Sequence, residues 1–137
     1  MRIGPMLAIV AAALLATASL PATKTAADDV RILTLPNSVR GAWAPNADAC
    51  EGSGNGRIDI AAKTHSTPDA NCEIAWITVT ASRDGPVYSA RSMCTQTRTG
   101  QKDPPSYLVI SPRPDNQLLV RRPNAGSEGA PVIYRKC

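Results

Sequence analysis

Four cysteines are the residues of this chain that most clearly carry chemistry: Cys50, Cys72, Cys94 and Cys137. An even number of cysteines in a small exported domain indicates two disulfides. Of the three ways to pair them we predict the sequential one, Cys50–Cys72 and Cys94–Cys137, because an up-and-down order of strands brings neighbours in the sequence together. The rival interpretation is a zinc site, but the chain has no Cys-x-x-Cys spacing, which argues against it.

His65 is the single histidine of the sequence and therefore the only candidate for the base of a Ser-His-Asp arrangement. It lies in the polar stretch Lys63–Thr67, just before Pro68, and the chain contains no Gly-x-Ser-x-Gly motif. We therefore predict a histidine on an exposed loop rather than a catalytic one.

Paired carboxylates, the groups that hydrolyse glycosides, are the second catalytic chemistry to consider. Most Asp and Glu residues adjoin Gly, Asn or Pro, as turns require, and we expect Asp59 and Glu73 to face solvent from strands. The glycine-rich stretch Asn46–Gly56 lacks the residue order of a calcium loop, and no helix pattern follows it as in a phosphate-binding loop. The sequence thus predicts no catalytic, cofactor-binding or metal-binding residues and no cofactor.

Basic residues are concentrated in the second half of the chain. Residues 28–82 contain four Lys and Arg against seven Asp and Glu, whereas residues 83–137 contain nine against four. Neighbouring strands could gather these charges into a patch for an anionic partner; the alternative is that they are scattered and only solvate the surface. The candidate patch consists of Arg91, Arg121, Arg122, Arg135 and Lys136.

Arg121 and Arg122 are adjacent in a predicted strand, where successive side chains point to opposite faces. We expect one of them to face solvent. The other must lie at a barrel end, pair with an acid such as Asp59 or Glu73, or sit where the strand has frayed.

The elements that position these residues are short strands. With 12 Pro, 9 Gly and 4% aromatic residues, the composition suits many short turns better than long helices. Alternating and β-branched segments predict strands over Val30–Leu35, Gly41–Trp43, Arg57–Ala62, Cys72–Ala81, Val87–Cys94, Tyr107–Ser111, Gln117–Arg122 and Val132–Lys136. Short connections favour antiparallel neighbours, so we predict an all-β fold: a small antiparallel meander barrel or sandwich of about seven to eight strands with two disulfides.

Polar stretches rich in Asn, Asp, Gly and Pro separate these strands. They predict loops at Asn46–Gly56, His65–Asn71, Thr95–Pro105 and Pro123–Pro131, and turns at Asn37–Arg40, Asp84–Gly85 and Asp115–Asn116.

The predicted core contains Trp43, Trp76, Ile58 and Ile60, because the tryptophans are large and the chain has no Phe. The alternative is that one tryptophan lines an open ligand cavity, as in lipocalins, but the shortage of aromatic residues favours a filled interior.

A signal peptide is expected before the domain. Arg2 is followed by the apolar run Met6–Leu15, and small residues allow cleavage after Ala18 or after Ala27. The run is too short to cross about 30 Å of hydrocarbon. We therefore expect a signal peptide within residues 1–27, one β-barrel domain over residues 28–137, no transmembrane span, and a periplasmic or secreted protein.

The anchor residues of the domain form a characteristic skeleton. It opens with Leu35-Pro36-x-x-x-Arg40-Gly41-x-Trp43, continues through the cysteines and ends with Tyr134-Arg135-x-Cys137. In this skeleton the chain resembles a group of small exported alphaproteobacterial proteins with no established activity. The resemblance implies a small barrel with two disulfides and carries over no catalytic residue.

A weaker similarity, in architecture alone, is to the periplasmic lysozyme inhibitors. Their Ser-Gly-x-x-Tyr loop motif is not matched by the nearest stretch here, Val87–Arg91.

These observations together predict an exported, monomeric, non-enzymatic binding module. The first hypothesis is a protein-interaction or inhibitor-like domain of the cell envelope that presents the loops Asn46–Gly56 and Thr95–Pro105. The alternative is a binder of anionic envelope lipid or lipopolysaccharide through the basic C-terminal half, and a small hydrolase is the least supported. We do not expect nucleic acid as a partner, because the interleaved aromatic residues of single-strand binders are missing.

Overall fold

The computed structural model describes residues 29–51, 56–122 and 129–137. The predicted signal peptide and its two cleavage sites lie outside the described residues, as do parts of the predicted loops Asn46–Gly56 and Pro123–Pro131. The described part contains one α-helical turn, α1 (Ala47–Cys50), and one 3₁₀ turn, Asn37–Val39, which was predicted as a turn. Its strands are β1 (Val30–Ile32), β2 (Gly41–Ala44), β3 (Ile58–Ile60), β4 (Thr64–Thr67), β5 (Ala70–Ser82), β6 (Gly85–Gln96), β7 (Ser106–Arg113), β8 (Gln117–Arg121) and β9 (Val132–Lys136).

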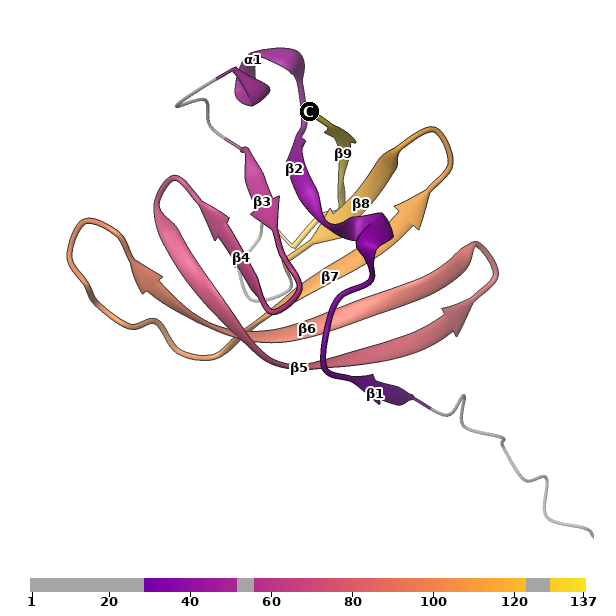
Figure 1. Ribbon diagram of the computed structural model, residues 1–137, viewed down its shortest axis with the longest axis horizontal. Coiled ribbons are helices and arrows are strands. Elements are labelled where there is room, and N and C mark those ends of the chain that lie inside the picture. The colour runs from indigo at the N-terminus through magenta and orange to yellow at the C-terminus, as the bar shows by residue number, and fades with distance from the viewer. Residues whose placement is uncertain (1–28, 52–55, 123–128) are drawn as a thin grey trace, which may run out of the picture.

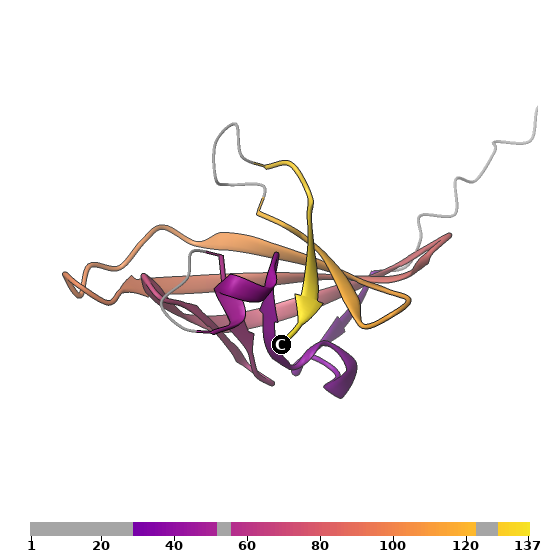
Figure 2. The ribbon, with the colours of Figure 1, turned by 90° about the horizontal axis from the view of Figure 1, so that it is seen from above.

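Strands β2 to β9 form a closed, eight-stranded, up-and-down barrel (Figure 1). Each strand pairs antiparallel with the next, and the last returns to the first, with Trp43 opposite Lys136. Strand β1 is a ninth strand, which pairs with the second half of β5. Strands β5, β6 and β7 run along the length of the molecule, as the view from above also shows (Figure 2). The predicted meander barrel is therefore confirmed, and the β9–β2 pairing makes it a barrel rather than a sandwich.

Alternation along the strands fills the barrel with apolar side chains. Of the predicted core residues, Trp43, Ile58 and Ile60 are buried, as expected. The Trp43 indole N–H donates a hydrogen bond to the carbonyl of Val39 at 3.0 Å, so the polar atom of this buried ring is satisfied. The rest of the buried cluster is Leu35, Val39, Ile77, Ala90, Leu108, Ile110, Leu118, Val120 and Tyr134.

The prediction that Trp76 is a core residue is wrong. The register of β5 against β6 shifts between Ile74 and Trp76, which leaves Ala75 as an extra residue. Such a β-bulge reverses which residues point inward. Ile74 packs against the core before the bulge and Ile77 is fully buried after it, so Trp76 is only half-buried and lies on the outer face.

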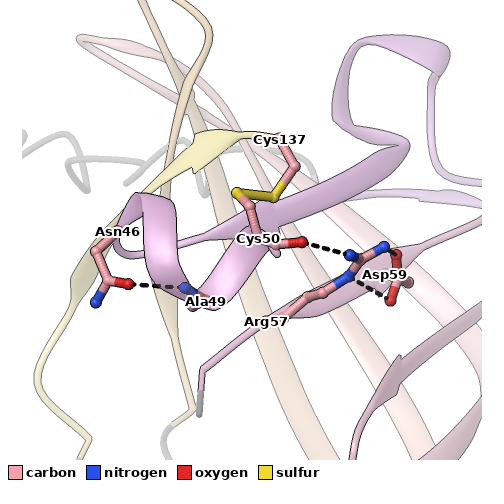
Figure 3. The surroundings of a disulfide bond; sticks show 6 residues. All are labelled: Asn46, Ala49, Cys50, Arg57, Asp59 and Cys137. Carbon is pink, nitrogen blue, oxygen red and sulfur yellow. Dashed lines mark hydrogen bonds and ion pairs between the residues drawn. A yellow bond between two sulfur atoms is a disulfide. The ribbon is translucent and has the colours of Figure 1, made fainter. Parts of the chain in front are cut away.

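The predicted disulfide pairing is also wrong. The structure joins Cys50 to Cys137 and Cys72 to Cys94. Barrel closure decides the first bond, because α1 follows β2 directly and β2 pairs with β9, which ends beside the C-terminal cysteine (Figure 3). Register decides the second bond, because Cys72 and Cys94 are directly opposite each other on β5 and β6.

The predicted loop His65–Asn71 is instead a hairpin. Strand β4 contains His65, β5 begins at Ala70, and Thr67 lies opposite Ala70, so the turn consists of Pro68 and Asp69. Strand β4 has no aliphatic residue, and the residue that it buries is histidine, so no apolar alternation marks it in the sequence. The predicted turn at Asp115–Asn116 is confirmed: both residues have positive φ, 63° and 54°, as a tight hairpin turn requires.

Candidate functional site

The predicted basic patch is divided among three places. Arg91 and Arg121 point outward from β6 and β8. Arg122 follows the end of β8 and lines a cavity at one end of the barrel together with His65. Arg135 is exposed on β9, and Lys136 lies over the ring of Trp43, with Nζ 5.6 Å from the ring centroid.

The expectation for the adjacent arginines is confirmed. Arg121 is exposed, whereas Arg122 is half-buried at the barrel end.

Two rows of side chains in register cover the outer face over β1, β5, β6, β7 and β8. One row places Trp76 opposite Arg91 and Arg91 opposite Tyr107. The second row runs Arg31, Thr78, Ser89, Val109 and Arg121, each residue opposite the next. We call the large residues of these rows, Arg31, Trp76, Arg91, Tyr107 and Arg121, the guanidinium–aromatic face.

Guanidinium groups and rings alternate across this face. Arg91 Cζ lies 4.9 Å from the Trp76 ring centroid and 5.6 Å from that of Tyr107, and its Nη1 donates a hydrogen bond to the Tyr107 hydroxyl at 3.2 Å. Arg31 Cζ lies 5.1 Å from the Trp76 ring centroid. At these distances the cations are attracted to the ring faces, so the long arginine side chains are held in place before any partner arrives.

The arginines of this face have no acidic partner in the described part of the chain. Over residues 29–51, 56–122 and 129–137 the single ion pair joins Arg57 and Asp59 at 3.0 Å, and Asp59 is on β3, which does not contribute to this face. Asp59 and Glu73 are both exposed, as predicted. The positive charge of Arg31, Arg91 and Arg121 is therefore available to a ligand.

A second group of residues lies on the inner side of the barrel wall, where His65 and Cys72 are buried and Cys94 is half-buried. His65 lies opposite Cys72 on β5, and Cys72 lies opposite Cys94 on β6; we call these three residues the histidine–disulfide row. His65 is 6% exposed and its Nε2 lies 2.8 Å from the hydroxyl of Ser92, which is fully buried. The other ring nitrogen, Nδ1, is buried without a hydrogen-bond partner among the described residues. The prediction of an exposed loop histidine is therefore wrong.

Burial, and to a smaller extent the positive charge of Arg122, together lower the pKa of His65 to about 4. The imidazole is therefore neutral at neutral pH. A cavity of about 180 Å³ borders the row and is also lined by Asp103, Tyr107 and Arg122. His65 and Ser92 resemble the base and nucleophile of a hydrolase, but Ser92 has no exposed surface for a substrate to reach.

The sequence missed Arg31 and Trp76 as members of one surface. Arg31 lies in the acidic half of the chain, and the pairing of β1 with β5 brings it beside Trp76. The row of His65, Cys72 and Cys94 was missed for the same reason, since its members are neighbours only through strand register.

Comparison with known proteins adds no relative: no family model, no curated protein and no solved structure matches the chain. The resemblance to small exported alphaproteobacterial proteins therefore stays a prediction. No helix within the described residues is long and apolar enough to cross a membrane.

Proposed function

We propose that this protein is an exported, non-enzymatic binding module whose guanidinium–aromatic face docks an acidic segment of a partner protein in the cell envelope. The observation that carries the proposal is a set of three arginines that form no ion pair in the described residues. Arg91 lies between Trp76 and Tyr107, Arg31 lies against Trp76, and Arg121 is opposite Val109 in the neighbouring row. Each of these arginines offers donors for a carboxylate.

The residue types on this face favour a protein partner over a lipid surface. Trp, Tyr and Arg are the residues that most often dominate the binding energy of protein interfaces. The ring contacts of Arg31 and Arg91 fix their side chains in advance, which reduces the entropy lost on binding. In the second row, the small residues Thr78 and Ser89 lie opposite each other, between Arg31 and Val109.

Export is supported by the covalent structure. All four cysteines are disulfide-bonded. Disulfides persist in oxidising compartments such as the periplasm and the extracellular medium.

Photo-crosslinking in the cell tests the proposal. Ala75 is exposed beside Trp76, so a photo-crosslinking amino acid at this position should give a discrete protein adduct. Arg91→Glu and Arg121→Glu should each abolish the adduct by reversing the charge. Arg98→Glu is the matched control, because Arg98 is exposed in the β6–β7 loop and lies outside the face; it should leave the adduct unchanged.

Vesicle flotation separates this proposal from lipid binding. We expect the purified protein not to float with phosphatidylglycerol vesicles at physiological salt. The anionic lipid hypothesis would replace this proposal if the wild type floats, if Arg91→Glu abolishes flotation, and if no protein adduct forms at Ala75.

A further inference from the structure

The histidine–disulfide row places three ligands of soft metal ions on adjacent strands. One ring nitrogen of His65 and the sulfurs of Cys72 and Cys94 lie within 4.8 Å of one another. The two cysteines are bonded to each other, so the oxidised row has no thiolate to offer. Once the disulfide is opened, the same positions supply two thiolates and an imidazole.

The hydrogen bond between His65 and Ser92 is of the kind that accompanies metal ligation by histidine. Such histidines bind the metal through one ring nitrogen while the other donates a hydrogen bond to a nearby oxygen, which fixes the tautomer. When His65 Nε2–H donates to Ser92 Oγ at 2.8 Å, the lone pair of Nδ1 is free, and this atom is buried without a partner. A buried polar atom without a partner is costly and calls for an explanation.

We propose that reduction of Cys72–Cys94 converts the histidine–disulfide row into a binding site for monovalent copper. Thiolate ligands select soft ions, and copper(I) is among the softest that proteins bind. Two thiolates and a neutral imidazole around Cu⁺ carry a net charge of −1. Arg122, which lines the same cavity as His65 and both cysteines, supplies the balancing positive charge.

The chemistry requires a dithiol as reductant. A thiolate of the dithiol attacks one sulfur of the disulfide, and its second thiol then resolves the mixed disulfide. Two electrons and two protons pass to Cys72 and Cys94, and the dithiol leaves as its own disulfide. Binding of Cu⁺ then displaces the two thiol protons to solvent.

The fold can open this bond without coming apart. Strands β5 and β6 remain paired from Ala70 opposite Gln96 to Ser82 opposite Gly85, and Cys50–Cys137 still ties the barrel seam. Cys94 is only half-buried, so a reductant can approach it. A groove of about 430 Å³ borders both cysteines and is also lined by Met93, which is 50% exposed.

Copper titration of the full mature chain tests the proposal. The protein is reduced anaerobically with dithiothreitol. Thiol alkylation of one portion identifies the opened bond. Cu⁺ is added to the unalkylated portion in competition with a copper(I) chelator. We expect Cys72–Cys94 to open first, one Cu⁺ bound per reduced chain, none bound by the oxidised chain, and X-ray absorption that reports two sulfur and one nitrogen ligands.

Two variants separate a metal site from general thiol chemistry. His65→Leu should weaken copper binding at least tenfold and remove the nitrogen ligand, and Cys72→Ser with Cys94→Ser should abolish binding. Arg98→Glu is a surface control and should bind as the wild type does. The proposal is overturned if copper binding does not depend on His65, if only zinc is taken up, or if Cys72–Cys94 cannot be reduced without unfolding the protein.

Discussion

The two disulfides of this barrel lie in regions that differ in how many strand pairs hold them together. Cys50–Cys137 joins α1 to the last residue at the seam where β9 meets β2, a seam held by two register pairs. Cys72–Cys94 crosses β5 and β6, which form the longest ladder of the barrel. The first bond closes a seam that little else closes, whereas the second adds a covalent link to strands that are already paired. We therefore assign a structural role to the seam bond, whereas the cross-strand bond is the one for which we propose reduction and copper binding.

Loss of the seam disulfide should have the largest effect. The chain-entropy relation gives about 4.6 kcal/mol for cysteines 87 residues apart and about 3.4 kcal/mol for cysteines 22 apart. Cys50→Ser with Cys137→Ser should therefore lower the free energy of unfolding in urea by more than Cys72→Ser with Cys94→Ser does. The reverse order would break the comparison and make the cross-strand bond the structural one.

Trp43 should be the most important side chain of the seam. It is 2% exposed on β2 opposite Lys136, and Trp43→Ala should cost about 3–5 kcal/mol of unfolding free energy, as for other large buried aromatic residues. Trp76→Ala is the matched control, because Trp76 is half-buried on the outer face, and it should cost less than half as much. Equal losses of unfolding free energy in urea for the two variants would contradict the outward orientation of Trp76 that the bulge at Ala75 produces.

The region of the cross-strand bond should be sensitive to acid through His65. Its pKa is about 4 in the folded protein against an ordinary value of 6.5, so the unfolded chain binds the proton more readily. The stability of the oxidised protein should be complete above pH 6.5 and fall by about 3 kcal/mol as the pH approaches 4. Arg122 and Asp103 line the same cavity and share this environment.

Urea unfolding between pH 4 and 7 measures this slope. His65→Leu should flatten it over the same window, whereas Arg98→Glu should not. A wild-type stability that stays constant from pH 6.5 to 4 would show that His65 is not sealed in the folded state.

The smallest expected effect concerns the cap of α1, which carries Cys50 to the seam. The side-chain oxygen of Asn46 accepts a hydrogen bond from the backbone N–H of Ala49 at 2.9 Å (Figure 3). Asn46→Ala should cost about 1 kcal/mol, and Asn46→Asp should keep most of the stability because aspartate also caps. Calorimetric melting resolves this difference, and identical melting of Asn46→Ala and the wild type would show that the disulfide alone holds α1.

Local patterns in the sequence were enough to predict the fold class and most of the strands. Alternation placed Ile58 and Ile60 inside, and Asp115–Asn116 was recognisable as a tight turn because both residue types tolerate positive φ. These are properties of a residue and its near neighbours, and the chain carries them wherever it folds. Strand β4 was missed because the residue that it buries is a histidine.

Tertiary structure alone decided which distant residues meet. The disulfide partners depend on the β9–β2 closure and on the β5–β6 register, neither of which leaves a trace in cysteine spacing. One extra residue, Ala75, moved Trp76 from the core to the guanidinium–aromatic face, and the pairing of β1 with β5 brought Arg31 to it. The physical reason is the same in each case. Side chains alternate between the two faces of a strand, so a single-residue shift of register exchanges the faces, and the register depends on turns, bulges and the pairing of strands distant in sequence.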